Sequence, residues 1–542
     1  MSQKNTIIHL VIFFIAILLI GCKEQIEKPH LESQELSRDI SGLPLAKKSD
    51  IVILSDNEVL KLSAMPVIKE IAGRKIRMFG YNGEIPGPII KVKQKSTVLI
   101  NFTNNIELPT TVHWHGIRLE NRYDGVPDIT QNPVFTGESF LYKLTFPDEG
   151  VYWYHPHIRE DIQQELGLYG NIIVEPISED YYDKVDKEEF LFLDDIRLAK
   201  NDVDTYGKDF ARFALMGRFG NILLINGETE YNLTVKRGDL VRFYLTNSAN
   251  TRIFNFSIGG KKLRIIGGDS GRFEHEEIKD SIVLSPAERN IIEVLFDTEG
   301  EFRLLHKAWG KEYELGRINV LQSNLSIVNH KSFSPRNFYS LLYLQQESSL
   351  KTFLVGDNIT SEYNLKSNSE IVNSIEKLRI YFNKEPDYDL VLTMEMQNME
   401  GMKHNMQDSS DSIEWEDNMP SMNAMSSSKN TRWIIKDKKT GKENMDIDYT
   451  VKVGDVKKIR IFNEANSFHP MHHPIHLHGQ RFLVLAINDK PNENIGWKDT
   501  VLVPKGAKVD ILIEFTNPGK WMIHCHIAEH LESGMMAMFT VE

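Results

Sequence analysis

Two short sequence patterns each occur three times along the chain, and this repetition restricts the possible folds more than any other feature. The first pattern occurs at 82–104, 226–247 and 449–463, and its second copy reads NGETEYNLTVKRGDLVRFYLTN. The second reads FPDEGVYWYHPH at 146–157, FDTEGEFRLLHKA at 296–308 and FTNPGKWMIHCH at 515–526. Copies that lie roughly 150 to 220 residues apart are too widely spaced for a solenoid, so each copy marks a separate domain.

The segments around these patterns have the composition of β-strands. Stretches rich in Val, Ile, Phe and Thr are separated by Gly, Pro and Asn, which is typical of strands joined by turns. The chain has 542 residues, enough for three domains that each have a core. We therefore predict an all-β fold of three Greek-key β-sandwich domains, at 50–178, 186–325 and 340–542.

The C-terminal segment contains a dense group of metal-binding side chains, namely His524, Cys525, His526, His530 and Met535. Alternate residues of a strand share a face, so His524 and His526 would serve one metal site and Cys525 a second site behind it. One Cys, two His and a weak Met form the ligand set of a blue-copper electron-transfer centre. The segment thus predicts two metal sites that are joined through the main chain of Cys525.

The repeat allows the three domains to be compared at these positions. Domain 1 has His155-Pro156-His157 and domain 3 has His524-Cys525-His526, whereas domain 2 has His306-Lys307-Ala308. Alanine offers no ligand, and a lysine is protonated at neutral pH. Domain 2 is therefore expected to bind no copper, with His306 in a structural role.

Ten of the 18 His residues lie in four short motifs. The motifs are His113-Trp114-His115-Gly116, His155-Pro156-His157, the segment HPIHLHG from His473 to Gly479, and the segment HCHIAEH from His524 to His530. The first two lie in domain 1 and the last two in domain 3. Only docking of domain 1 against domain 3 can bring all four together.

These four motifs, in this order, resemble those of the laccase-type multicopper oxidases. The resemblance extends over nearly the whole chain, including NGEIPGP at 82–88. It implies three cupredoxin-like domains that hold four copper ions. The implied type 1 ligands are His473, Cys525, His530 and, as a long axial contact, Met535. The implied type 2 ligands are His113 and His476, and the implied ligands of the type 3 pair are His115, His155, His157, His478, His524 and His526.

The resemblance also implies a reaction. A reducing substrate gives electrons to the type 1 copper, and dioxygen is reduced to water at the cluster of the other three. An axial Met implies a lower type 1 potential than high-potential laccases have. Asp124, in the segment DGVPDITQ, and Glu529 match the acids that supply protons in the family. Each acid could instead act only by orienting His ligands through hydrogen bonds.

A Met-rich segment, residues 394–425, bears on the identity of the reducing substrate. It contains eight of the 18 Met residues: Met394, Met396, Met399, Met402, Met406, Met419, Met422 and Met425. Thioethers favour Cu(I), and an insert of this kind is similar to that of periplasmic cuprous oxidases that confer copper tolerance. The alternative is a surface loop that binds nothing. Packing of these Met residues in a core is not expected, because polar residues interrupt every helical face.

Three more residues are candidates for binding a substrate copper, namely Met471, His472 and Met445. Met471 matches a substrate-copper Met of the cuprous oxidases, whereas His469 stands where those enzymes have an Asp. His472 and Met445 are further candidates.

Three functions remain open from the sequence. The first is oxidation of Cu(I) in copper tolerance, with dioxygen as the acceptor. The second is a laccase-like oxidation of phenols, or oxidation of another metal ion such as iron or manganese. The third is a catalytically silent scaffold of the cell envelope, which the complete ligand set disfavours.

The N-terminus predicts a location in the cell envelope. An apolar run from Ile7 to Ile20 is too short for an ordinary membrane span and fits the core of a signal peptide. It ends in Leu19-Ile20-Gly21-Cys22, which resembles a bacterial lipobox. We expect a signal peptide at 1–21, a lipidated Cys22 on a membrane surface and a polar tether at 22–49, in the periplasm or at the cell surface. An uncleaved anchor or a simple secretory signal is the alternative.

The charge and the cysteine count limit the partners. The net charge of −13 argues against nucleic acid. Cys22 and Cys525 are the only cysteines. Because one is expected to carry lipid and the other to bind copper, no internal disulfide is predicted. We also expect the protein to be a monomer.

Overall fold

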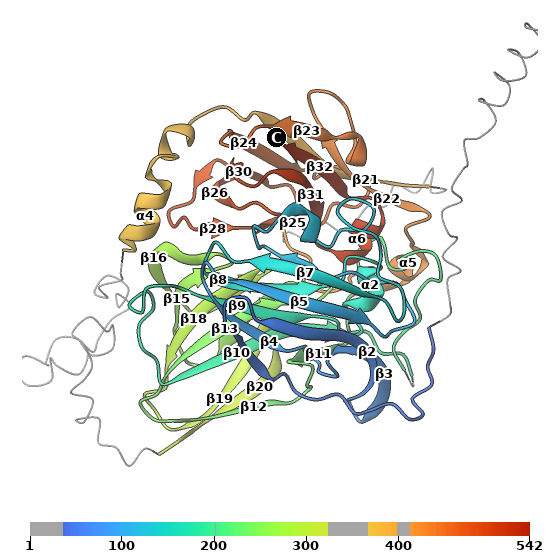
Figure 1. The fold of residues 1–542 in the computed structure, drawn as a ribbon, viewed down its shortest axis with the longest axis vertical. Coiled ribbons are helices and arrows are strands. Elements are labelled where there is room, and N and C mark those ends of the chain that lie inside the picture. The colour runs from blue at the N-terminus through green and yellow to red at the C-terminus, as the bar shows by residue number, and fades with distance from the viewer. Residues whose placement is uncertain (1–35, 201, 323–366, 398–411) are drawn as a thin grey trace, which may run out of the picture. The chain divides into compact units, whose positions relative to one another are not determined.

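Strands dominate the part of the chain that this computed structural model describes, residues 36–200, 202–322, 367–397 and 412–542. They form six sheets, and each sheet draws its strands from one of three consecutive stretches of the chain (Figure 1). The prediction of an all-β fold is confirmed. The expected signal peptide, Cys22 and the residues Met399, Met402 and Met406 lie outside the described residues.

The first stretch forms two sheets. One has the order β1 (Ile51–Leu54), β4 (Ile89–Lys93), β9 (Gly170–Glu175), β8 (Gly150–His155) and β6 (His113–His115). The other has the order β3 (Arg74–Tyr81), β2 (Val59–Ile71), β5 (Thr97–Asn104) and β7 (Ser139–Thr145). Along β5 every second residue is buried, as expected for a strand that turns one face to the core of a sandwich.

The second stretch also forms two sheets. One has the order β11 (Ile222–Ile225), β10 (Lys187–Ile196), β13 (Leu240–Asn247), β18 (Arg289–Leu295), β15 (Leu263–Gly268) and β16 (Gly271–Lys279). The other has the order β12 (Tyr231–Lys236), β20 (Lys311–Leu321), β19 (Gly300–Ala308), β14 (Phe254–Ile258) and β17 (Ile282–Leu284).

The third stretch repeats the arrangement. One sheet has the order β22 (Thr431–Asp437), β21 (Tyr388–Met396), β24 (Val456–Asn463), β30 (Lys508–Glu514), β26 (Phe482–Ile487) and β27 (Lys490–Pro491), with β28 (Trp497–Lys498) also paired to β26. The other has the order β23 (Asp448–Val451), β32 (Met536–Val541), β31 (Gly519–Cys525), β25 (His473–Leu477) and β29 (Thr500–Val503).

The sequence repeat corresponds to a repeat of strand pairing. In domains 1 and 3 the strand that carries the second pattern pairs antiparallel with a strand that contains predicted ligands. His113 pairs with His155, and His476 pairs with His524. At the same place in domain 2, Phe256 pairs with His306. Domain 2 therefore has a phenylalanine where the other two domains have the first histidine of the pair.

Helices are short and few among the described residues. They are η1 (Asn121–Tyr123), α2 (Glu160–Gln163), α4 (Ser369–Glu376), η5 (Arg379–Tyr381), α5 (Pro420–Met425), η6 (Asn444–Asp446) and α6 (Ala528–Glu532). Helix α2 follows β8 and helix α6 follows β31, and the two helices pack against each other. None of the helices in the described ranges is both long and apolar enough to cross a membrane.

The last residues of the predicted tether pair with domain 1. The Ala46 amide donates to the Ile68 carbonyl at 2.7 Å, and the Lys47 amide donates to the Gly83 carbonyl at 2.9 Å. The Ser49 hydroxyl donates to the Pro86 carbonyl at 2.7 Å. The tether as predicted, 22–49, is thus too long at its C-terminal end. Main-chain pairing with β2 holds this polar stretch, and composition does not reveal such pairing.

Candidate metal centres

Cys525 at the end of β31, His473 at the start of β25 and His530 on α6 converge on one point. The Cys525 Sγ lies 3.5 Å from His473 Nδ1 and 3.7 Å from His530 Nδ1, and the two nitrogens are 3.3 Å apart. A point equidistant from the three atoms lies about 2 Å from each, close to the usual bond length from imidazole to a first-row metal ion. All three side chains are fully buried or nearly so.

The chemistry of this group fits a soft metal ion. Burial raises the pKa of the Cys525 thiol above its usual range, so a buried thiolate here requires a cation beside it. Met535 is also fully buried, and its carbonyl accepts a hydrogen bond from the Cys525 amide at 3.1 Å. These residues suit the copper that the type 1 prediction assigns to them.

Trp433 on β22 completes the walls of this site and was not predicted. Its ring stacks on His530 with 4.1 Å between centroids and meets His473 edge to face at 4.8 Å. The indole Nε1 donates to the Ala214 carbonyl at 2.7 Å, which fixes the ring. Nothing in the sequence distinguishes Trp433 from a core tryptophan, because the pairing of β22 with β21 that positions it is a tertiary feature.

Eight further histidines gather where domain 1 meets domain 3. They are His113, His115, His155, His157, His476, His478, His524 and His526, and each is at least nine-tenths buried. His115 stacks on His476 at 3.6 Å between ring centroids, and His113 stacks on His478 at 4.0 Å. Strand β6 of domain 1 thus faces β25 of domain 3 directly. The side-chain nitrogens of His157, His478 and His524 also lie close enough together to share one ion.

Main-chain carbonyls fix the tautomer of several of these rings. The Nδ1 of His113 bonds to the Asp124 carbonyl at 2.7 Å, and the Nδ1 of His476 bonds to the Asp499 carbonyl at 2.8 Å. The Nδ1 of His155 bonds to the Pro156 carbonyl at 2.9 Å. A carbonyl can only accept, so each Nδ1 carries the proton and each Nε2 presents a lone pair. Among the described residues, the Nε2 atoms of these three rings have no hydrogen-bond partner, as expected of metal ligands.

Two ring nitrogens that both lack a proton face one another in this cluster. The Nε2 atoms of His478 and His524 lie 2.9 Å apart. The other nitrogen of His478 bonds to the Asp124 carboxylate at 2.9 Å, and that of His524 bonds to the Cys525 carbonyl at 2.9 Å. Both Nε2 atoms therefore carry lone pairs, and a cation between them would turn this repulsion into attraction. The residues fit a metal ion at this place.

Burial keeps these histidines neutral. It lowers the pKa of nine of the ten predicted ligand histidines, to about 4 for His524. The others are His115, His155, His157, His473, His476, His478, His526 and His530. A neutral imidazole is the form that binds a metal ion, so these rings are ready to bind without first losing a proton.

The two predicted proton-relay acids lie beside the histidines. Asp124 is buried and contacts His113 through its carbonyl and His478 through its carboxylate. Glu529 lies on α6 next to His530; its carboxylate accepts hydrogen bonds from Asn250 Nδ2 at 3.4 Å and Thr251 Oγ1 at 3.3 Å. Burial raises the pKa of Glu529 to about 8. The contacts of Asp124 fit both a proton relay and a purely orienting role, whereas the hydrogen bonds given for the Glu529 carboxylate are with Asn250 and Thr251 and not with a predicted ligand.

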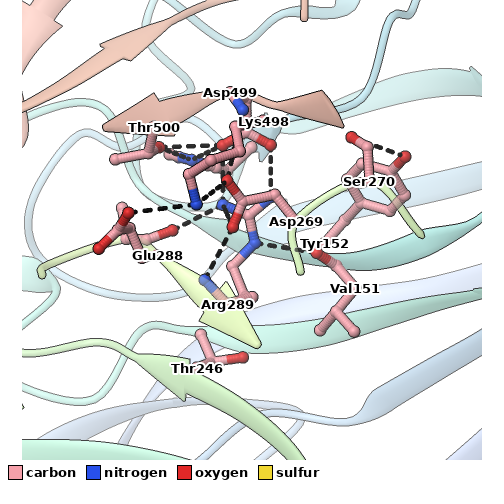
Figure 2. A network of polar contacts seen from close by, with 12 residues as sticks. Val151, Tyr152, Thr246, Asp269, Ser270, Glu288, Arg289, Lys498, Asp499 and Thr500 are labelled. Carbon is pink, nitrogen blue, oxygen red and sulfur yellow. Dashed lines mark hydrogen bonds and ion pairs between the residues drawn. The ribbon is translucent and has the colours of Figure 1, made fainter. Parts of the chain in front are cut away.

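Asp499 and Arg289 border the same cluster and were not predicted. The Asp499 carboxylate accepts a hydrogen bond from His115 Nε2 at 3.1 Å, and Arg289 of domain 2 forms an ion pair with it (Figure 2). The segment Trp497-Lys498-Asp499-Thr500 offers no periodicity that would single out the Asp. His115 and Arg289 are each more than 200 residues away from Asp499 in the sequence, so only the docked domains reveal these contacts.

The described Met residues of the Met-rich segment do not share one environment. Met394 is 4% exposed and belongs to the core of domain 3, and Met396, Met419 and Met422 pack against that core. Met425 is 71% exposed. The expectation that core packing does not use these residues is wrong for Met394. That prediction assumed a helix. Because β21 is a strand, every second side chain is buried, and these are Leu390, Leu392 and Met394.

The other residues considered for a substrate copper differ in their exposure and in their hydrogen bonds. Met471, two residues before His473, is fully buried, and Met445 is 48% exposed. His472 is buried, accepts the Glu414 amide on Nδ1 at 3.1 Å and has no partner on Nε2. His469 is buried with neither ring nitrogen bonded.

In domain 2, His306 behaves as a packed core residue. Its Nδ1 accepts the Asn255 amide at 3.1 Å, and its ring packs on Phe254 at 5.2 Å and Tyr313 at 5.7 Å. Burial lowers its pKa to about 3. These contacts agree with the structural role expected from Lys307 and Ala308.

Three models of one protein family match the chain in succession. Each is described as multicopper oxidase, and they match residues 67–179, 180–312 and 414–542. The multicopper oxidase mco of Staphylococcus aureus is 25% identical over 471 residues, which are 85% of this chain and 83% of that protein. The multicopper oxidase MmcO of Mycobacterium tuberculosis is 25% identical over 503 residues, 88% of this chain and 85% of that protein.

Solved structures show the same fold. The multicopper oxidase of Campylobacter jejuni, described as a metallo-oxidase, aligns with a TM-score of 0.64 and 23% identity over 93% of this chain and 99% of that one. The multi-copper oxidase of Pseudomonas thermotolerans aligns with a TM-score of 0.63 and 24% identity over 90% of this chain and all of the other. The prediction of cupredoxin-like domains is confirmed by these alignments.

Proposed function

Because the chain belongs to the multicopper oxidase family, copper-dependent oxidoreductases that use dioxygen, we propose that its reducing substrate is Cu(I) and that it serves copper tolerance in the cell envelope. The observation that supports this substrate is a pair of further buried histidines beside the type 1 ligand His473. His469 and His472 lie buried within four residues of His473, and both have ring nitrogens without a hydrogen-bond partner in the part of the chain that the structure describes. Soft and imidazole ligands are those that bind copper.

Bound at the predicted ligands, copper supplies one-electron steps between the reducing substrate and dioxygen. The protein provides the connection between the two groups. Cys525 belongs to the type 1 group, and its sequence neighbours His524 and His526 belong to the histidine cluster. The electron path is therefore covalent and a few bonds long.

Other residues would exclude water and manage protons. Trp433, Met535 and the surrounding core keep the type 1 group away from solvent. We infer that the buried Asp124 and Glu529 supply protons for the reduction of dioxygen to water, and a raised pKa suits Glu529 to hold a proton near neutral pH.

The proposal for Cu(I) is tested with Met→Leu substitutions, which preserve volume but remove the thioether. We expect the triple variant Met399→Leu/Met402→Leu/Met406→Leu to raise KM for Cu(I) about tenfold and leave oxidation of a phenol unchanged. The exposed Met425→Leu is the matched control, and it should alter neither rate.

The measurement is steady-state oxygen consumption by the same copper-loaded preparation with Cu(I), Fe(II) and a phenol in turn. Cu(I) turnover that is unchanged in the triple variant would remove the role of these Met residues. A preference of the parent protein for the phenol would reject Cu(I) as its substrate.

A laccase-like function is the second candidate. It is favoured by relatives with that name, such as Laccase-1 of Thanatephorus cucumeris, 25% identical over 518 residues that make up 84% of this chain and 86% of that protein. In that case bulky phenols would be oxidised faster than Cu(I) in the comparison above.

A further inference from the structure

Asp499 holds one predicted ligand from each of two domains. Its carboxylate Oδ1 accepts a hydrogen bond from His115 Nε2 at 3.1 Å. Its main-chain carbonyl accepts one from His476 Nδ1 at 2.8 Å. Because the two imidazole rings stack at 3.6 Å, a shift of Asp499 would displace both rings. Bonding of His115 through Nε2–H leaves its Nδ1, which has no hydrogen-bond partner among the described residues, free to bind a metal ion.

Arg289 of domain 2 fixes the Asp499 carboxylate. Its guanidinium is fully buried, and Nη1 donates to Asp499 Oδ1 at 2.7 Å while Nη2 pairs with Oδ2. The same side chain donates through Nε to the Val151 carbonyl at 2.9 Å and through Nη1 to the Ala287 carbonyl at 2.6 Å. One guanidinium thus contacts all three domains, as Figure 2 shows.

Neighbouring charges hold this pair in place. The Asp269 carboxylate accepts the Arg289 amide at 2.9 Å, and it also pairs with Lys498 at 3.2 Å. Lys498 in turn pairs with Glu288 at 3.1 Å (Figure 2). Two cations and three carboxylates therefore alternate through the network. The carboxylates thus exceed the cations by one negative charge, and Asp499 is the carboxylate that contacts the histidine cluster.

The glycine of the first His motif belongs to the same contact. Gly116 has a φ of +84°, and a Cβ there would overlap Asp499 Oδ2 and lie 3.0 Å from Arg289 Nη2. A side chain at this position would push the carboxylate away from His115. The packing gives a physical reason for glycine after His113-Trp114-His115.

We propose that Arg289 is a positioning residue for the cluster of three coppers: by fixing the Asp499 carboxylate, it holds His115 in the tautomer that binds metal and aligns His115 with His476. Domain 2, which has no predicted copper ligand, then completes the cluster. This inference depends on copper binding at the predicted ligands and not on Cu(I) as the reducing substrate. An arginine is needed because its planar fork reaches the carboxylate and the Val151 carbonyl at once, which a lysine cannot do.

The test compares Arg289→Lys and Arg289→Met with Arg264→Met in the full chain reconstituted with copper. Arg264 is the matched control, since it is 1% exposed, lies on the neighbouring strand β15 and pairs with Glu293 and Glu276 rather than with the cluster. The readouts are copper per chain, the blue absorption of the type 1 copper and the paramagnetic resonance signal of the type 2 copper.

We expect both Arg289 variants to keep the type 1 absorption while the affinity of the three-copper cluster falls about 10- to 100-fold. The type 2 signal should be altered or lost, and more so in Arg289→Met. Arg264→Met should retain the parental ratio of type 2 to type 1 signal. The proposal is overturned if folded Arg289→Lys, identified by its type 1 absorption, has the parental copper content and type 2 signal. An equal loss of type 2 copper in Arg264→Met would also overturn it.

Discussion

Asp124 illustrates at the residue scale how one side chain can have two roles. Its carbonyl fixes His113 and its carboxylate fixes His478, so it orients two predicted ligands that belong to different domains. The same carboxylate is the group that resembles the proton relay of the family. Orientation needs only an oxygen that accepts a hydrogen bond, whereas a relay needs a group that can gain and lose a proton.

The variant Asp124→Asn separates the two roles. Asparagine retains an oxygen acceptor for His478 Nδ1 and the same main-chain carbonyl for His113. We expect copper content to remain at the parental level while the turnover of dioxygen falls about 10²- to 10⁴-fold, because the amide cannot carry the proton. Copper analysis and oxygen consumption are measured on the same sample. Parental turnover in Asp124→Asn would leave only the orienting role.

Some residues of the sites lie in the sequence motifs, whereas others lie outside them. The ten histidines and Cys525 lie in motifs that can be read along the chain, and the resemblance of these motifs to those of the family implies that they are ligands. Asp499, Arg289 and Trp433 carry no such local signal. Each acts through a contact with residues far away in the chain.

At the scale of elements, the strands with predicted ligands are covered on both faces. β8, β25 and β31 are buried along nearly their whole length, whereas β5 and β12 alternate between buried and partly exposed residues. One face of a ligand strand packs on the core of its own domain, and the other face packs on the neighbouring domain. Both sides of β31 are thus available for sites, which separates Cys525 from its two histidine neighbours.

Strand β21 gives an element-scale prediction about the Met-rich segment. Met394→Ala should lower the free energy of unfolding by about 2 to 5 kcal/mol, because it removes a side chain from the core of domain 3. Met425→Ala, at an exposed position, should change it by less than about 0.5 kcal/mol. Denaturant unfolding of the copper-free chain measures both values. A loss below about 1 kcal/mol for Met394→Ala would contradict its assignment to the core.

For the whole molecule, the buried histidines and buried acids act on stability in opposite directions. The nine histidines have native pKa values below the ordinary value of about 6.5. Their contribution to stability is present above pH 6.5 and is lost as the pH falls toward the native values. Glu165, Glu529 and Asp194 have pKa values raised by burial to about 7, 8 and 8. Their contribution is lost as the pH rises toward 8.

We therefore expect the copper-free chain to be most stable near pH 6.5. Below that pH the unfolded chain takes up more protons than the native one, because its histidines are free to ionise. Above pH 6.5 the buried acids of the native chain lose protons that the same acids have already lost in the unfolded chain, so the stability falls. Thermal unfolding of the copper-free chain between pH 5 and 8 tests this expectation. A Tm that rises steadily from pH 5 to pH 8 would contradict it.

The sequence by itself determined which residue types could bind metal, how many sandwich domains to expect and in which domain to expect no copper ligands. These properties depend on local spacing, on strand periodicity and on comparison of three internal copies, all of which can be read along the chain. Phe256, which pairs with His306, supports the expectation that domain 2 has no copper ligands.

Only the tertiary structure decided which polar residues complete the sites, where Met394 packs and how residues 44–50 join domain 1. These features arise where surfaces from distant parts of the chain meet, and their energies depend on distance and burial. The Arg289–Asp499 pair is the clearest case. Two charged residues that would be ordinary surface groups on separate domains become a buried pair beside His115 when the three domains dock.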